Sequence, residues 1–281
     1  MTNLVFKILR FSGLPSLFRA AFQRKKVTIL MMHDISPDAA RQAFVFWKKR
    51  YNIISFEDFL QAKRTNSVIP PKALILTLDD GHKGNYRLLP LIKKHKVPVT
   101  VFLCPEIAGT NRHFWFMHKG IDPEELKKLP DDKRLERLHE HGFDEKKEFK
   151  ERQALSEKEI EEMKASPFVS FQSHTRFHPV LTQCSDQKAA DEIKNSKTEL
   201  EGKFGLKVNG FAYPNGSYSK RETDIVSKAG YDYAVTTDAG YNSLDTDIFR
   251  LKRFSVNDSG NLDEIIVKTS GLWGLVKKVF R

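Results

Sequence analysis

The sequence predicts an α/β protein, a distorted barrel of seven or eight β/α units with a helical insertion. Short apolar segments alternate with helical patterns, as in a parallel sheet that is buried on both faces. About seven such units favour a closed or nearly closed barrel over an open sheet. The 281 residues are 40% apolar, which is enough for the sizeable core that such a barrel needs.

The individual elements follow from the length and periodicity of the apolar segments. The expected strands are residues 27–33, 73–79, 98–103, 168–172, 209–213, 233–236 and 249–254. The expected helices are residues 38–50, 56–64, 84–95, 186–204 and 219–229. Ser219, followed three residues later by Glu222, has the capping-box pattern that begins the last helix.

Residues 121–165 depart from this alternation because 26 of these 45 residues are charged. Ser156 followed by Glu159 again indicates a helix start. The few apolar residues are helically spaced and include Leu126, Leu129, Leu135 and Leu138. We expect a helical insertion on one rim of the barrel, either as solvated helices or as a lid over a substrate.

The net charge of +11 resides at the two ends of the chain. Residues 1–33 hold six basic residues and no acidic one, and residues 265–281 hold four and none, which leaves 37 basic and 36 acidic residues between them. A nucleic-acid enzyme usually carries a basic stripe on its folded body, so no nucleic-acid partner is expected. We divide the chain into a basic amphipathic segment (1–26), a barrel (27–260) and a basic amphipathic tail (261–281).

Both ends have the composition of interfacial helices, with large apolar residues among basic ones. In residues 4–22 the apolar spacing is helical and is broken near Gly13 and Pro15. We expect these ends either to dock on the barrel or to contact an anionic membrane surface. Charges inside the first apolar stretch argue against a cleavable signal, and two isolated cysteines against a disulfide framework. The expected location is the cytoplasm, with peripheral attachment to the inner face of the cell membrane as an option.

Candidate metal ligands follow two of the predicted strands. Asp79 and Asp80 end one strand, and adjacent carboxylates at a buried strand end call for a metal or a shared proton, although Asp-Asp-Gly often marks a plain turn. His174 and His178 follow another strand and can face one ion, although such pairs are also common as surface or core residues. Asp80 with both histidines would form a three-ligand set of the kind that catalytic Zn²⁺ uses.

Three further residues are candidates for roles in the site. His33 ends the first strand, where it is either a core residue or a group that transfers a proton near neutral pH. Asn215 lies in a turn shaped by Pro214 and Gly216, and such a turn can point a backbone N–H at a developing oxyanion. Trp115 is either a core anchor or a platform for stacking on a sugar ring.

The residues in three of these segments, in this order and spacing, resemble the polysaccharide deacetylases of carbohydrate esterase family 4, the NodB-homology group. The segments are Thr77-Leu-Asp-Asp-Gly81, His174-Thr-Arg-Phe-His178 and Tyr213-Pro-Asn-Gly216, within a resemblance over roughly residues 27–256. The resemblance implies a distorted (β/α) barrel that removes N- or O-acyl groups from sugars with a divalent metal. It implies that Asp79 is the general base, that Asp80, His174 and His178 bind the metal, and that the turn at Asn215 supplies the oxyanion N–H.

Two positions depart from the family pattern. Ala212 stands where the family often has an arginine, and Arg253 is the candidate replacement beside the base. The usual C-terminal Leu-x-His is missing, since His178 is the last histidine of the chain. The segment from Leu30 to His33 is instead similar to the circularly permuted poly-N-acetylglucosamine de-N-acetylases, in which the acid histidine comes from the first strand. This similarity implies that His33 is the general acid.

The resemblance implies a carbohydrate de-N-acetylase, a hydrolase of linear amides, in cell-surface glycan biosynthesis. The expected cofactor is a divalent metal, Zn²⁺ first, with Co²⁺, Ni²⁺ and Mn²⁺ as alternatives. The expected partner is an N-acetylated sugar polymer or a lipid-linked oligosaccharide. A sugar N-deformylase, an O-deacetylase and an inactive glycan-binding module remain alternatives, because the same residues are compatible with each of them.

Overall fold

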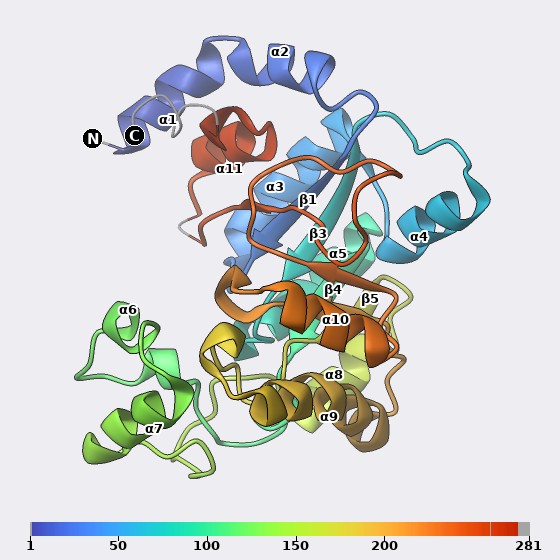
Figure 1. Ribbon diagram of the computed structural model, residues 1–281. Helices are drawn as coiled ribbons and strands as arrows, with labels where there is room; N and C mark the ends of the chain where they lie inside the picture. The colour runs from blue at the N-terminus through green and yellow to red at the C-terminus, as the bar shows by residue number, and fades with distance from the viewer. Residues whose placement is uncertain (1, 259, 275–281) are drawn as a thin grey trace.

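The computed structural model describes residues 2–258 and 260–274 and contains the predicted barrel-like sheet (Figure 1). Parallel strands follow the order β7-β6-β5-β4-β3-β1-β8, with β2 also paired to β3. A parallel bridge between Val235 and Leu251 links the two edges, so the sheet curls into an incompletely closed barrel. The strands are β1 (Val27–Met32), β2 (Asn52–Ile53), β3 (Ala73–Leu78), β4 (Val99–Leu103), β5 (Val169–Ser173), β6 (Gly210–Ala212), β7 (Tyr233–Val235) and β8 (Phe254–Ser255).

The pairing of β1 with β3 brings two distant parts of the chain to one rim. Every residue of both strands is buried, as expected for strands covered on both faces. Met32 is paired with Leu78, so the two strands end at the same level. The next residues, His33 and Asp79, therefore start neighbouring loops at the carboxyl end of the sheet.

Helices cover the outside of the curled sheet, and their starts agree with the capping patterns in the sequence. Ser55 and Ser219 each form a capping box with the acidic residue three positions later. The helices between strands are α3 (Pro37–Arg50), α4 (Phe56–Thr65), α5 (Leu89–His95), α9 (Asp186–Phe204) and α10 (Lys220–Lys228).

The structure differs from the sequence prediction at three elements. Of the expected strand 249–254, only Phe254 belongs to a strand, β8 (Phe254–Ser255). The short strand β2 was not predicted. The expected helix 84–95 is divided into a 3₁₀ helix, η1 (Lys83–Leu88), and α5. Pro90 stands at the first turn of α5, where its missing N–H costs no hydrogen bond, so a new helix begins there.

The predicted insertion is helical, and its first two helices pack around a small core of their own, whereas the third packs on β5 and α9. Its helices are α6 (Pro123–Leu126), α7 (Asp131–Glu140) and α8 (Glu157–Lys164), the last with the expected Ser156–Glu159 capping box. Leu126, Leu138 and Phe143 pack with the buried Trp115. In Figure 1, α6 and α7 project from the body at one side of the sheet. Two residues at α6, Glu124 and Lys127, line a cleft at the carboxyl ends of the strands, which is described below.

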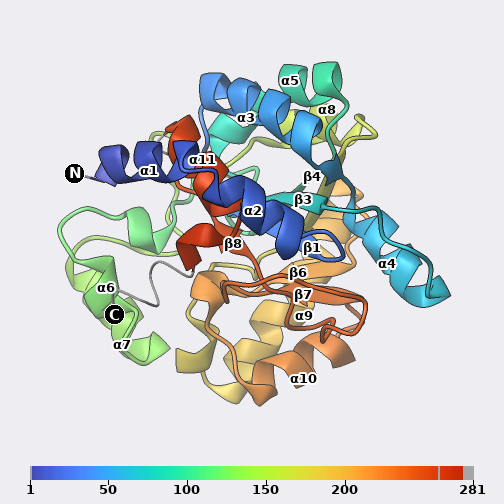
Figure 2. The same cartoon turned by 90° about the horizontal axis from the view of Figure 1, so that it is seen from above.

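The N-terminal segment forms two helices, α1 (Thr2–Phe11) and α2 (Leu14–Ala21), separated at Gly13 as predicted. Gly13 has a φ of 79°, a left-handed conformation that favours glycine. Figures 1 and 2 show both helices running over the outside of helix α11 (Leu262–Thr269). In the described part of the chain, no helix combines the length and the apolar character that crossing a bilayer requires.

Helix α11 packs against the body of the protein, which is one of the two arrangements expected for the C-terminal end. Ile265, Ile266 and Val267 are consecutive and almost completely buried, between α1 on one side and α3 on the other. Because its apolar residues surround the helix instead of forming one stripe, the helix belongs in the core. Residues 275–281, which complete the predicted tail, lie outside the described residues.

Candidate active site

A cleft of about 610 Å³ opens at the carboxyl ends of the strands. In parallel β/α folds this end of the sheet carries the active site, because the loops after the strands meet there. The cleft gathers residues that lie more than 180 positions apart in the sequence. Its lining includes six residues predicted from the sequence: His33, Asp79, Asp80, His174, His178 and Asn215.

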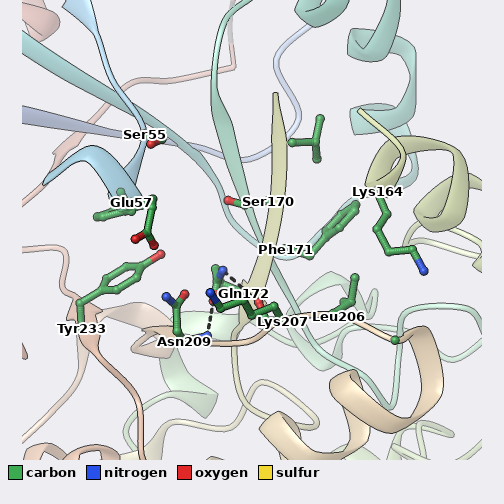
Figure 3. Close-up of a pocket in the computed structure, with 13 residues that line it drawn as sticks. Ser55, Glu57, Lys164, Ser170, Phe171, Gln172, Leu206, Lys207, Asn209 and Tyr233 are labelled. Carbon is green, nitrogen blue, oxygen red and sulfur yellow. Dashed lines mark hydrogen bonds between the residues drawn. The ribbon is translucent and has the colours of Figure 1, made fainter. Parts of the chain in front are cut away.

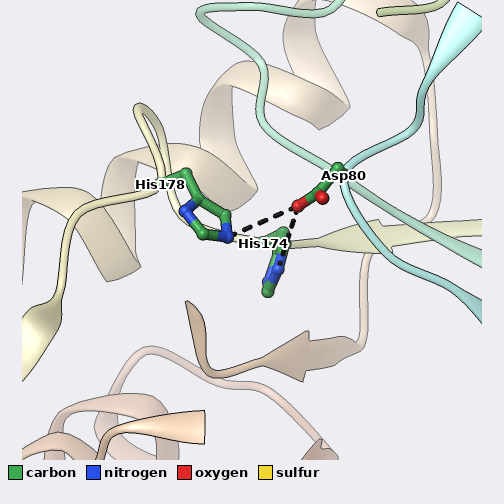
Figure 4. A group of neighbouring side chains, drawn as sticks. All are labelled: Asp80, His174 and His178. Carbon is green, nitrogen blue, oxygen red and sulfur yellow. Dashed lines mark ion pairs between the residues drawn. The ribbon is translucent and has the colours of Figure 1, made fainter. Parts of the chain in front are cut away.

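Asp80, His174 and His178 converge on one point at the base of this cleft (Figure 4). The Nε2 atoms of His174 and His178 lie 3.5 and 3.4 Å from Asp80 Oδ1, and all three side chains are buried. Asp80 Oδ1 has no hydrogen-bond partner among the described residues. A buried carboxylate oxygen without a donor, facing two imidazole nitrogens, has the chemistry of a divalent metal site.

The protonation of the two histidines agrees with this interpretation. His174 Nδ1 lies 2.8 Å from the Ala212 carbonyl oxygen, which keeps the proton on Nδ1 and leaves the Nε2 lone pair facing Asp80. Burial lowers the pKa of His178 to about 3, although Asp80 opposes the shift. The His178 ring is therefore neutral near pH 7, the form in which histidine binds metals.

Asp79 is held by Arg253, the residue that the sequence suggested as the partner of the base. Arg253 donates two parallel hydrogen bonds to the Asp79 carboxylate, Nη1 to Oδ1 at 2.7 Å and Nη2 to Oδ2 at 2.8 Å. Burial is the largest single influence and would raise the pKa of Asp79, but the surrounding groups, the Arg253 guanidinium first among them, together hold that pKa below its ordinary value. Asp79 is therefore an ionised carboxylate beside the metal-ligand group.

His33 lies at the edge of the cleft, with 39% of its side chain exposed. Its backbone N–H donates to Asp258 Oδ1 at 3.2 Å, and its Nδ1 lies 4.0 Å from Asp258 Oδ2. Asn85 donates a hydrogen bond to the His33 carbonyl at 2.7 Å. The loop is thus fixed on both sides, while the imidazole stays open to a ligand.

Asn215 also lines the cleft, in the turn after β6. Its φ of 56° is left-handed, a conformation that asparagine tolerates better than most residues. The Thr237 hydroxyl donates to the Asn215 carbonyl at 3.5 Å. The predicted role of its N–H toward an oxyanion stays a prediction.

Residues 67–234 match the family model for polysaccharide deacetylases. The chain belongs to this family. Among curated proteins, none matches the chain. The match covers the Asp-Asp-Gly, His-x-x-x-His and Pro-Asn-Gly segments, and it makes the chain a hydrolase of the carbohydrate de-N-acetylase class.

Solved structures share the fold of this polysaccharide deacetylase at low sequence identity. Streptococcus pyogenes deacetylase PplD, solved with acetate, is 23% identical, with a TM-score of 0.62, and the alignment covers 86% of this chain and 99% of that one. IcaB from Ammonifex degensii is 18% identical, with a TM-score of 0.64 and coverage of 88% and 98%. The BpsB deacetylase domain from Bordetella bronchiseptica is 16% identical, with a TM-score of 0.63 and coverage of 83% and 96%.

The deacetylase site contains one histidine that the sequence reasoning missed. His82 Nε2 lies 3.1 Å from Asp80 Oδ2, the oxygen that faces away from His174 and His178. Burial alone would raise the pKa of Asp80, but His82 and the other two histidines hold it well below its ordinary value. The signal was available, because His82 follows directly after the Asp-Asp-Gly segment.

Glu192, which was also missed, holds the metal-binding turn in an unusual shape. Thr175 and His178 have φ values of 66° and 60°, which non-glycine residues rarely adopt. Glu192 Oε2, from α9, accepts hydrogen bonds from the backbone N–H groups of Arg176 at 2.8 Å and Phe177 at 3.0 Å. These bonds offset the strain of the turn. Nothing in the helical pattern of α9 marks this glutamate.

The suggestion that Trp115 stacks on a sugar is wrong, and its alternative as a core anchor is correct. Its side chain is buried, its Nε1 donates to the His178 carbonyl at 2.7 Å, and the Arg134 guanidinium lies 4.5 Å from its ring. The next two residues, Phe116 and Met117, line the cleft instead. The apolar side chains that a ligand can contact in this segment are therefore Phe116 and Met117, and not Trp115.

A second hollow, of about 270 Å³, lies at the other end of the strands (Figure 3). Its lining includes Glu57, Lys164 and Tyr233, and none of the motif residues. Gln172 Oε1 accepts hydrogen bonds there from the backbone of Asn209 and Gly210. These contacts join β5 to β6 and have no link to the chemistry at the carboxyl ends.

Proposed function

We propose that this polysaccharide deacetylase hydrolyses the N-acetyl groups of amino sugars in a glycan, with a divalent metal held by Asp80, His174 and His178. The observation that carries the proposal is the Asp80 Oδ1, which has no hydrogen-bond donor in the described part of the chain and faces two imidazole nitrogens, beside the Asp79–Arg253 pair. Zn²⁺ is the first candidate because two histidines and one carboxylate are a ligand set of catalytic zinc. Co²⁺, Ni²⁺ and Mn²⁺ are the alternatives.

A metal bound there supplies a water of lowered pKa and a positive charge beside the acyl oxygen. In the proposed reaction Asp79 accepts a proton as the water oxygen forms a bond to the acetyl carbon. The Asn215 N–H donates to the negatively charged acyl oxygen. His33 gives a proton to the sugar nitrogen as the carbon–nitrogen bond breaks, so acetate and a free amine leave.

Each role is supported by the surroundings of the residue. Arg253 keeps Asp79 ionised and orients both of its oxygens. Asp258 accepts the His33 backbone N–H and lies 4.0 Å from the His33 Nδ1, so it holds the imidazole at the edge of the cleft. His33, Phe116 and Met117 line the same cleft of about 610 Å³, where a sugar would bind.

We further propose that the enzyme acts in the cytoplasm during the synthesis of a cell-surface glycan, on a polymer or a lipid-linked precursor. Both cysteines, Cys104 and Cys184, are buried free thiols, which agrees with a reducing compartment. The near-neutral body between the two basic ends agrees with a carbohydrate substrate, which carries no phosphate backbone to neutralise.

Product analysis tests the proposal. The purified protein is incubated with N-acetyl, N-formyl and O-acetyl sugar conjugates, both free and lipid-linked, and released acid and free amine are quantified. We expect acetate and amine in equal amounts from an N-acetyl sugar, loss of activity with a chelator, and recovery with one of the four metals. Formate or O-acetyl release alone would replace the proposed reaction, and turnover unaffected by the chelator would exclude the metal.

A further inference from the structure

Helices α1 and α2 expose apolar side chains on their outer face, in addition to Phe6, Leu9 and Phe18, which pack inward against the body. Four apolar side chains, Leu4, Ile8, Phe11 and Leu17, are each 61–70% exposed. The two arginines within the helices point inward. Arg10 pairs with Asp263 at 2.5 Å, and the Arg19 guanidinium is buried over the rings of Phe46 and Tyr51. Surface helices of globular proteins normally present polar side chains on their outer face.

Exposed basic residues border this apolar surface. Lys7 is exposed within α1, and Arg24, Lys25 and Lys26 are exposed directly after α2. Beside them, a hollow of about 540 Å³ is lined by five basic residues: Arg24, Lys48, Lys49, Arg50 and Lys72. Residues 1–33 contain no acidic side chain, so nothing within this segment neutralises the positive charge.

We propose that this outer face, made of Leu4, Ile8, Phe11, Leu14, Leu17 and Phe22, inserts into the surface of an anionic membrane. Apolar residues that point outward from two helices, bordered by lysine and arginine, are the composition of interfacial membrane helices. Charge complementarity favours an anionic lipid surface over a second copy of the chain, because two copies would bring their basic borders together.

A short series of contacts connects the start of helix α1, which carries part of this face, to the edge of the candidate active site. Asn261 donates a hydrogen bond of 3.0 Å to Asn3, at the start of α1. Three residues before Asn261, Asp258 contacts His33 at the edge of the cleft. A membrane-bound enzyme would therefore hold its cleft close to the lipid surface, where the sugar of a lipid-linked substrate lies. Only this last step rests on the proposed function.

Vesicle flotation of the full chain tests the proposal. Vesicles of phosphatidylcholine alone are compared with a mixture containing phosphatidylglycerol, each at low and at high salt. We expect binding to the anionic vesicles that weakens with salt. Ile8→Glu/Leu17→Glu should reduce binding by about a hundredfold, and Arg24→Gln/Lys25→Gln/Lys26→Gln by a similar factor with a weaker salt dependence.

Val45→Glu is the matched control, because Val45 is a 41% exposed apolar residue on α3, outside the outer face. This variant should bind vesicles as the wild type does. Circular dichroism and turnover of a soluble N-acetyl substrate verify that each variant is folded, and neither depends on lipid. Absence of binding at low salt, or unchanged binding of Ile8→Glu/Leu17→Glu, would overturn the proposal. A concentration-dependent dimer that the same double variant dissociates, without lipid binding, would assign the face to a second copy instead.

Discussion

Arg253 and Asp79 are joined by two parallel hydrogen bonds across 174 residues of sequence. Both side chains are almost completely buried, and the guanidinium also donates to Thr77 Oγ1 at 3.1 Å and to the Thr236 carbonyl at 2.8 Å. Bidentate pairing of this kind fixes the plane of the carboxylate as well as its charge. Arg253, which directly precedes β8, therefore orients the carboxylate of Asp79, which directly follows β3.

The first prediction concerns the contribution of the Asp79–Arg253 ion pair to the stability of the fold. Arg253→Gln leaves a buried carboxylate without its cation and should lower the unfolding free energy by about 3–5 kcal/mol. Asp79→Asn/Arg253→Gln should recover most of this loss, because neither charge is then left alone. Urea unfolding of the wild type, both single variants and the double variant measures the coupling. If the losses of unfolding free energy in the two single variants simply added up in the double variant, the predicted coupling would be contradicted.

Asp79→Asn alone should keep bound metal and lose turnover by a factor of about 10²–10⁴, the usual value of a general base. Metal content and turnover are measured on the same sample. Simultaneous loss of metal would make Asp79 a ligand instead of the base.

The sequence predicts those parts of the site that depend on local order along the chain. Asp79, Asp80, His174 and His33 each follow an apolar strand, and parallel strands bring their carboxyl ends to one rim. The alternation of strands and helices thus predicts both the fold class and the side of the sheet on which these residues gather.

Contacts that depend on tertiary packing could not be predicted in this way. Asp258 follows the last strand, and only the pairing of β1 with β8 brings it beside His33. Glu192 lies inside a helix, where its sequence pattern resembles that of any solvated glutamate. Trp115 has the composition of a sugar platform, but the insertion helices cover its ring, so its burial depends on side chains more than ten residues away.

The second prediction concerns the metal ligands. His174→Ala and His178→Ala should each remove bound metal and activity together while the barrel stays folded, because the core strands are apolar and make no use of the ion. Metal content by mass spectrometry, turnover and circular dichroism are the measurements. His139→Ala, on α7 and exposed, is the matched control and should change none of them. A His174→Ala or His178→Ala protein with stoichiometric metal and full rate would refute the ligand set.

The third prediction concerns His33. His33→Ala should lower the turnover of an N-acetyl substrate by a factor of about 10²–10⁴, because an amine leaves poorly without a proton. An activated ester should lose much less, since its phenolate leaves without one. The ratio of the two losses is the measurement. Equal losses would indicate that His33 has a structural role at this edge of the cleft, and the general acid would have to be sought elsewhere.

The last prediction follows from the buried glutamate beneath the metal-binding turn. Burial is the main cause that raises the pKa of Glu192 to about 7 from an ordinary value of 4.5, although the N–H groups of Phe177 and Arg176 oppose it. Between pH 4.5 and about pH 7, Glu192 therefore keeps its proton in the folded protein, whereas in the unfolded chain it has lost it. Stability from this group is complete below about pH 4.5 and is lost as the pH rises through 7.

Glu192→Gln removes this titration and keeps an oxygen that accepts both N–H groups. Relative to this variant, the wild type should lose about 2–3 kcal/mol of unfolding free energy between about pH 5 and pH 8. Urea unfolding of both metal-free proteins at the two pH values gives the difference, in which the titration of all other groups cancels. Glu201→Gln, an exposed carboxylate of the same helix, serves as the control and should show no such change. If wild type and Glu192→Gln differ by the same amount at both pH values, Glu192 is ionised throughout, and the turn is held by a charged acceptor.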